Sequence, residues 1–121
     1  MRINDQMSIA QLKEKFNEMF KGLKMEFYKV KHSENKASSL EDQYDENTLL
    51  KSVSEKDING HILIDLKMTV ADLEKSFEEQ FGFHVQVFRR SNDIWLQTSS
   101  TDYWTLEDQN TKGLHSLIQQ V

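Results

Sequence analysis

Two segments of the chain place apolar residues three and four positions apart. These positions are Ile9, Leu12, Phe16 and Phe20, and then Val70, Leu73, Phe77 and Phe81. Such spacing gives an α-helix one apolar face, so the pattern predicts amphipathic helices over residues 8–21 and 69–81. A hydroxyl residue that can cap the helix precedes each segment, and a glycine that can end it follows: Ser8, Thr69, Gly22 and Gly82.

Apolar and polar positions alternate after each predicted helix. Period two is typical of strands, and we expect them at 24–31 and 83–90. A short apolar strand is predicted at 61–66, and its weaker counterpart at 1–4 is left open. The segment 94–98 resumes the alternation after Ser91-Asn92-Asp93, which predicts a β-hairpin.

Two further helices are predicted later in each half of the chain. The ranges are Leu40–Val53 and Leu106–Ile118. Gly113 lies in the middle of the second range and weakens it by about 1 kcal/mol relative to alanine.

The two helix segments match each other at a constant offset of 61 residues. Six aligned pairs are identical: Met7/Met68, Ala10/Ala71, Leu12/Leu73, Phe16/Phe77, Glu18/Glu79 and Phe20/Phe81. The run Leu40–Gln43 also recurs as Leu106–Gln109. We interpret this pattern as an internal duplication, with halves at about 1–60 and 61–121.

The predicted elements suggest one α+β domain spanning residues 1–121. Two β-α-β units in series indicate a ferredoxin-like βαββαβ core, with an extra β-hairpin strand and two additional helices. The helices at 8–21 and 69–81 would cover one sheet face. The other face would carry Glu26, Tyr28, Gln86, Phe88, Arg90, Trp95 and Gln97. Its aromatic rings need a cover, either the two additional helices or a second subunit.

Composition narrows the classes of function. The 121 residues include no cysteine, which excludes disulfides, thiolate metal sites and thiol catalysis. The net charge of −5 argues against nucleic-acid binding, whose main term is phosphate neutralisation. No apolar run approaches the ~20 residues of a membrane span, and the first residues lack the apolar core of a signal peptide. We therefore expect a cytoplasmic protein that meets neither membrane nor nucleic acid.

Catalytic and cofactor motifs are not recognisable in the chain. The spacing of the four histidines matches no zinc signature. The acids around Glu41 and Asp45 suit the first turn of a helix better than acid–base chemistry. Four scattered glycines make no phosphate loop, and no serine or threonine lies between paired glycines. We predict no catalytic residue, no metal and no cofactor, although enzymatic activity stays uncertain.

The densest mixture of aromatic and polar residues lies at 95–110. Within or beside it, the candidate binding residues are Arg90, Trp95, Gln97, Asp102 and Trp104. The same segment could instead be a structural corner in which Trp104 plugs the core ahead of Thr105, a helix cap. Arg89-Arg90 beside aromatic rings also permits single-stranded nucleic acid, but alternation sends the two arginines to opposite faces.

These motifs also carry a resemblance. The runs Val85-Gln-Val-Phe-Arg-Arg-Ser-Asn-Asp-Ile-Trp-Leu-Gln-Thr98 and Thr101-Asp-Tyr-Trp-Thr-Leu-Glu-Asp-Gln-Asn110 resemble a family of small uncharacterised bacterial proteins. The opening Met68-Thr69-Val70 is similar to the helix start of those proteins. The resemblance implies a bacterial, intracellular context, and it assigns no activity and no catalytic residue.

Three hypotheses for function follow. The leading one is a non-enzymatic protein-interaction or scaffold module that binds a protein partner or self-associates. The alternative is a small-ligand binding protein or enzyme that uses the segment Trp95–Asn110, with the ligand unknown. The third is single-stranded nucleic-acid binding.

Overall fold

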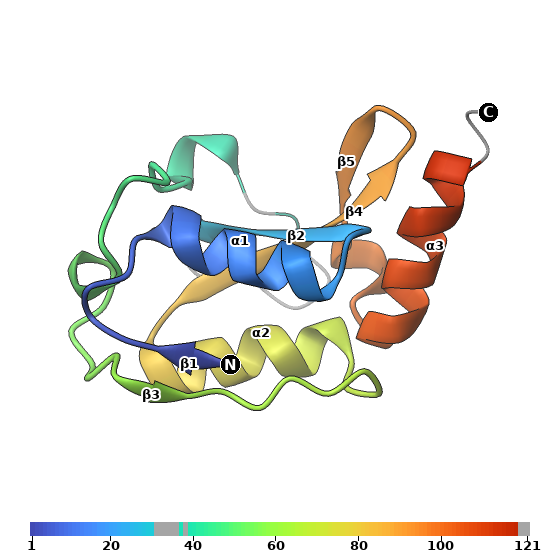
Figure 1. Ribbon diagram of the computed structural model, residues 1–121. Coiled ribbons are helices and arrows are strands. Elements are labelled where there is room, and N and C mark those ends of the chain that lie inside the picture. Colours follow the sequence, from blue (N-terminus) through green and yellow to red (C-terminus); the bar gives the residue numbers. More distant parts are fainter. Residues whose placement is uncertain (31–36, 38, 119–121) are drawn as a thin grey trace.

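The computed structural model describes residues 1–30, 37 and 39–118, and it shows an α+β protein with two antiparallel sheets (Figure 1). The helices are α1 (Ile9–Met19), α2 (Val70–Phe81) and α3 (Leu106–Ile118). The strands are β1 (Arg2–Ile3), β2 (Leu23–Tyr28), β3 (Gly60–His61), β4 (His84–Ser91) and β5 (Ile94–Gln97). The predicted strand at the N-terminus is therefore present, and the one at 61–66 is reduced to its first residue.

The strands do not join into the single sheet that a ferredoxin-like core requires. β1 pairs with β3, while β2, β4 and β5 form a separate sheet in that order, and every strand pair is antiparallel. β1 stops after two residues because Asn4 starts a turn, in which its side chain accepts from the Gln6 amide and its carbonyl from the Met7 amide. Asp65 makes the same turn ahead of α2, with Lys67 and Met68.

Both amphipathic helices begin at the predicted caps. The Ser8 hydroxyl accepts from the Gln11 amide, and the Thr69 hydroxyl accepts from the Asp72 amide. Gly82 ends α2 in the left-handed conformation, with φ of 73°. The same expectation for Gly22 is wrong, because the C-cap of α1 is Phe20 with φ of −135°.

The predicted helix at 40–53 is also wrong. Short 3₁₀ turns at Leu40–Asp42 and Leu50–Ser52 flank an extended stretch that pairs with other parts of the chain. The carbonyl oxygens of Glu46 and Thr48 accept from the amides of Ala10 and Ile9 at the start of α1. These carbonyls therefore satisfy donors that a helix leaves open at its N-terminus, and a helix at 40–53 would forfeit those bonds.

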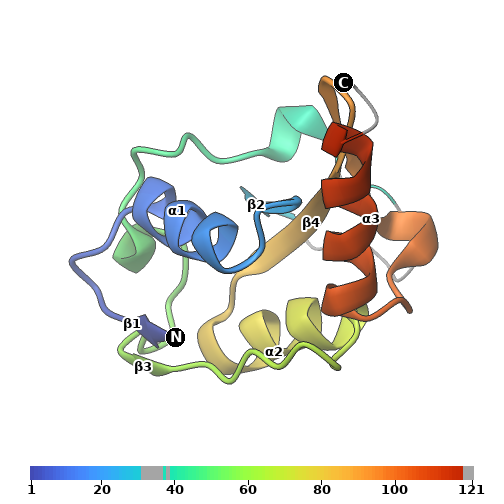
Figure 2. The same ribbon diagram turned by 45° about the vertical axis from the view of Figure 1, so that its right-hand side comes forward.

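The core lies between the inner face of the β2–β4 pair and the helices α1 and α2. Phe16 and Phe77 are fully buried, as predicted. The rings of Phe27 and Phe83 meet edge to face at 5.5 Å between centroids, which joins the two halves of the chain in one core. α3 lies beside β4 at the end of the sheet (Figure 2).

Candidate functional site

The outer face of the three-stranded sheet carries a mixed row of polar and aromatic side chains. The register aligns Glu26 with Gln86, Lys24 with Phe88, Phe88 with Gln97, and Arg90 with Trp95. Because side chains alternate along a strand, these residues share the face opposite the core. The predicted outward set did not include Lys24; its other members here, Glu26, Gln86, Phe88, Arg90, Trp95 and Gln97, are as the alternation predicts.

A hollow of about 270 Å³ opens on this face. Residues from all three strands and from the segment after residue 38 line it: Lys24, Glu26, Tyr28, Leu40, Gln43, Phe88, Trp95 and Gln97. Leu40 and Gln43 cover part of the face, but as a 3₁₀ turn and an extended residue, not as the predicted helix. None of these lining residues comes from α3, whose Gln109 instead accepts from Arg89, a residue that alternation places on the opposite face.

Two cations surround the ring of Trp95. The Lys24 Nζ lies 5.3 Å from its centroid and 5.1 Å from the centroid of Phe88. The guanidinium carbon of Arg90 also lies 5.3 Å from the Trp95 ring, and the Arg90 Nε donates to the Asn92 carbonyl. Cation–π contacts of this length hold the ring and both charges at the rim of the hollow.

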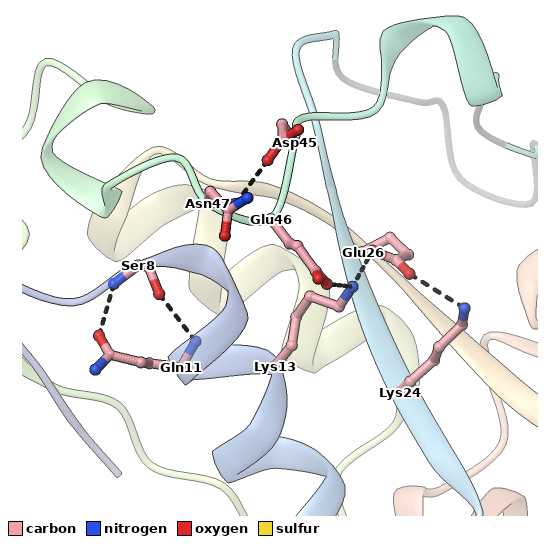
Figure 3. A network of polar contacts seen from close by, with 8 residues as sticks. All are labelled: Ser8, Gln11, Lys13, Lys24, Glu26, Asp45, Glu46 and Asn47. Atoms are coloured by element: carbon pink, nitrogen blue, oxygen red, sulfur yellow. Dashed lines mark hydrogen bonds and ion pairs between the residues drawn. The ribbon is translucent and has the colours of Figure 1, made fainter.

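Glu26 lines the hollow, and its carboxylate forms ion pairs with two lysines (Figure 3). Its carboxylate lies 2.7 Å from the Nζ of Lys13 on α1 and 3.1 Å from the Nζ of Lys24. Lys13 also reaches Glu46 at 3.4 Å. Burial and then the Glu26 charge raise the pKa of Tyr28 to about 12, so the phenol keeps its proton at neutral pH.

The predicted binding residues divide between two places. Trp95 and Gln97 line the hollow, and Arg90 stacks on Trp95 beside it. Asp102 is buried, and Trp104 contacts the guanidinium of Arg89, which alternation places on the opposite face of the sheet from Arg90. The structure therefore does not bring Asp102 and Trp104 together with Trp95.

The second part of that segment forms a structural corner. The carbonyls of Asp102 and Trp104 accept from the amides of Ala71 and Val70 at the start of α2. The hydroxyl of Thr105 accepts from the Asp108 amide and caps α3, as the corner interpretation predicts.

Sequence patterns alone did not single out Glu74. This α2 residue is 9% exposed, and its Oε2 accepts from the Val87 amide at 3.0 Å. Burial raises the pKa of Glu74 to about 8; the Val87 amide opposes the shift and the charge of Asp102 adds to it. In the sequence it stands among exposed acids of a helix, so only the tertiary contacts reveal it.

The residues that the structure describes form neither a metal site nor a membrane span. No group of three or more histidines and acids is placed to hold a metal ion. No helix in the described part of the chain combines the length and apolar character needed to cross a bilayer.

Comparison with known proteins adds no assignment. No family model, no curated protein and no solved structure matches this chain.

Proposed function

We propose that the protein is a non-enzymatic interaction module that holds a segment of a partner protein against its outer sheet face. The observation that carries the proposal is the pair Phe88 and Trp95, only partly buried at a hollow and flanked by Lys24 and Arg90. Tryptophan, tyrosine and arginine are enriched where proteins meet, because they combine a large contact area with polar anchors.

The charged groups of the hollow favour binding over catalysis. Glu26 already has a lysine within 3.1 Å of each carboxylate oxygen, which leaves it poorly placed to take a proton from a substrate. Tyr28 has a pKa of about 12 and is not a base at neutral pH. Gln43 and Gln97 donate and accept hydrogen bonds without titrating.

The test is selection of random phage-displayed peptides on the immobilised protein. Enriched peptides should bind the parent and lose about tenfold or more in affinity to Trp95→Ala and Phe88→Ala, since anchor residues dominate such contacts. Tyr103→Ala is the matched control, because Tyr103 is exposed and does not line the hollow. Failure to enrich any peptide, or binding that survives both substitutions, would contradict the proposal.

Self-association is the special case in which the partner is a second copy. Light scattering of the parent and of Trp95→Ala separates the cases: a dimer that dissociates on substitution makes the partner a second copy. The bacterial family resemblance and the cytoplasmic location stay predictions.

A small ligand is the second candidate, because polar and aromatic side chains line the hollow together. About 270 Å³ is just below the ~300 Å³ where small-molecule sites begin. A metabolite panel that raises the melting temperature of the parent, but not of Trp95→Ala, would support this candidate over a protein partner.

We also infer that the two halves arose by duplication. Corresponding hydrogen bonds support it: Ile9 to Thr48 and Val70 to Trp104, then Ala10 to Glu46 and Ala71 to Asp102, and Leu50 to Met7 and Leu106 to Met68. These bonds make Leu50 the counterpart of Leu106, so they do not support the match of Leu40–Gln43 to Leu106–Gln109. The turn before α1, at Asn4 and Gln6, also corresponds to the turn before α2, at Asp65 and Lys67, with the same offset of 61 residues.

Exchange of helix sequences tests the duplication. Residues 9–19 are replaced by the sequence of 70–80, with Lys13 and Asn17 kept because they bond to Glu26 and to the Leu23 carbonyl. The chimera should fold with a free energy of unfolding within about 1 kcal/mol of the parent, since the apolar faces match. A chimera that does not fold would contradict equivalent packing of the two halves.

A further inference from the structure

One edge of the three-stranded sheet is covered and the other is open over the described residues. Beyond β2, the Lys29 amide donates to the Asp42 carbonyl at 2.7 Å, and the Tyr44 amide donates to the Phe27 carbonyl at 2.8 Å. Beyond β5, no described strand pairs with Ile94–Gln97. An open edge strand is a template for another extended chain.

The alternation of hydrogen bonds along β4 shows which peptide groups of β5 point away from the sheet, toward its open edge. The Arg90 amide donates to Gly22, so the even-numbered residues of β4 bond toward β2. The Val87 carbonyl accepts from the Thr98 amide, so the odd-numbered residues bond toward β5. Antiparallel alternation then pairs Arg89 with Leu96 and turns the peptide groups of Trp95 away from β4.

The side chains of β5 leave apolar area on both sides of this edge. Ile94 is 58% exposed and Leu96 is 39% exposed on one side of the sheet. Trp95, on the other side, is partly exposed at the hollow. A strand added to β5 would cover both sides at once.

Two cations lie near this edge, although the whole chain carries −5 and Asp93 lies in the turn between β4 and β5. Lys24 and Arg90 each place their charge 5.3 Å from the Trp95 ring, over β5. Glu26 pairs with both Lys24 and Lys13, and Lys13 also reaches Glu46, so Arg90 carries most of the positive charge beside Trp95. The acids Glu41 and Asp42 follow Leu40 on the opposite rim, beyond β2.

We propose that the segment bound by this protein is acidic and extended, and that it adds to β5 as a further strand, with its carboxylates at Lys24 and Arg90. This proposal rests on the interaction function above and names the chemistry of the partner. Main-chain bonds along the edge supply affinity, and alternate side chains reach the hollow. The basic rim selects acidic segments over neutral and basic ones.

The test uses the full chain labelled with ¹⁵N and three capped eight-residue peptides. They alternate valine with glutamate, glutamine or lysine. The glutamate peptide should shift the indole N–H signal of Trp95, assigned with Trp95→Phe, and should slow hydrogen exchange at the Trp95 amide. Its affinity should exceed that of the lysine peptide at least tenfold and should fall with added salt.

Matched variants separate charge from pairing. Arg90→Gln and Lys24→Gln should each weaken the glutamate peptide about fivefold, whereas Lys15→Gln, which removes an exposed charge on α1, should not. Two N-methylated versions of the glutamate peptide are compared, one methylated at the odd-numbered and one at the even-numbered residues. The version that lacks the N–H groups facing β5 should no longer bind.

Other outcomes overturn the proposal. Equal binding by the lysine peptide removes the acidic specificity, and full binding by both N-methylated peptides removes strand addition; either leaves the interaction function standing. If none of the three peptides shifts the indole N–H signal of Trp95, the proposal is overturned outright. The interaction function then depends on the phage selection, which presupposes neither charge nor strand.

Discussion

At the scale of single residues, Lys13 and Glu74 show how one helical position takes opposite charges. Each stands five residues after its helix cap, Ser8 or Thr69. Lys13 reaches the carboxylate of Glu26, whereas Glu74 is buried and accepts from the Val87 amide. Burial disfavours the charged form of a carboxyl group, and this effect raises the pKa of Glu74.

Substituting Glu74 by glutamine should stabilise the protein as pH rises. The pKa of this carboxyl is about 8 in the folded chain against 4.5 for a free side chain. Between these values the unfolded chain releases a proton that the folded chain keeps, so rising pH favours unfolding. The stability of Glu74→Gln relative to the parent should therefore grow by about 3 kcal/mol from pH 4 to pH 7, as urea unfolding can measure.

The control is Glu79→Gln on the exposed side of α2, where the carboxylate lies 3.8 Å from Lys75. Its effect should stay within about 0.5 kcal/mol at both pH values, as for exposed ion pairs. A difference between Glu74→Gln and the parent that does not change with pH would show that Glu74 ionises normally in the folded chain.

At the scale of elements, the contact between α3 and the turn before β2 depends on two glycines. A Cβ on Gly113 would lie 2.5 Å from the carbonyl oxygen of Gly22, and a Cβ on Gly22 would lie 2.7 Å from the carbonyl of Asn110. The Gly22 amide donates to the Asn110 side chain at 2.8 Å. Gly22 thus serves close approach between backbones, not helix termination.

Gly113→Ala should destabilise the protein even though alanine is the better helix former. The gain in helix propensity is about 1 kcal/mol, whereas the clash falls on backbone atoms and should cost about 2–3 kcal/mol or more. We expect a net loss of at least 1 kcal/mol in chemical unfolding. Lys112→Ala, at the exposed neighbouring position, should change stability by less than 0.5 kcal/mol; a stabilised Gly113→Ala would refute the close contact.

Local patterns were sufficient for some elements and not for others. The spacing of three and four located α1 and α2, because the amphipathic face depends only on the sequence of the helix itself, and the hydroxyl residues before it marked both N-caps. The helix prediction was wrong for residues 43–49 because carbonyl groups of this stretch accept hydrogen bonds from amides of α1, more than thirty residues away in the sequence. The candidate site was predictable to the same extent. Alternation within one strand placed Trp95 and Gln97 on one face. The position of Asp102 and Trp104 depends on their bonds to the start of α2, which no local pattern reveals.

At the scale of the whole molecule, the two halves share one core. β2 pairs with β4 over six residue pairs, and the Phe27 and Phe83 rings meet at 5.5 Å. The buried apolar residues of α1 and α2 belong to the same cluster. Neither half could leave this core without exposing the apolar face of the other, which predicts a single unfolding transition.

Phe16→Ala tests this unity because its reporters lie in the other half. Phe16 is fully buried in the first half, while both tryptophans, Trp95 and Trp104, belong to the second. Removing the ring should cost about 3–5 kcal/mol. Since the core is shared, tryptophan fluorescence and far-ultraviolet circular dichroism should report the same lowered midpoint. Met19→Ala, at an exposed position of α1, should leave the midpoint nearly unchanged. A fluorescence transition that stays at the parental midpoint while the dichroism splits into two would mean that the halves unfold independently.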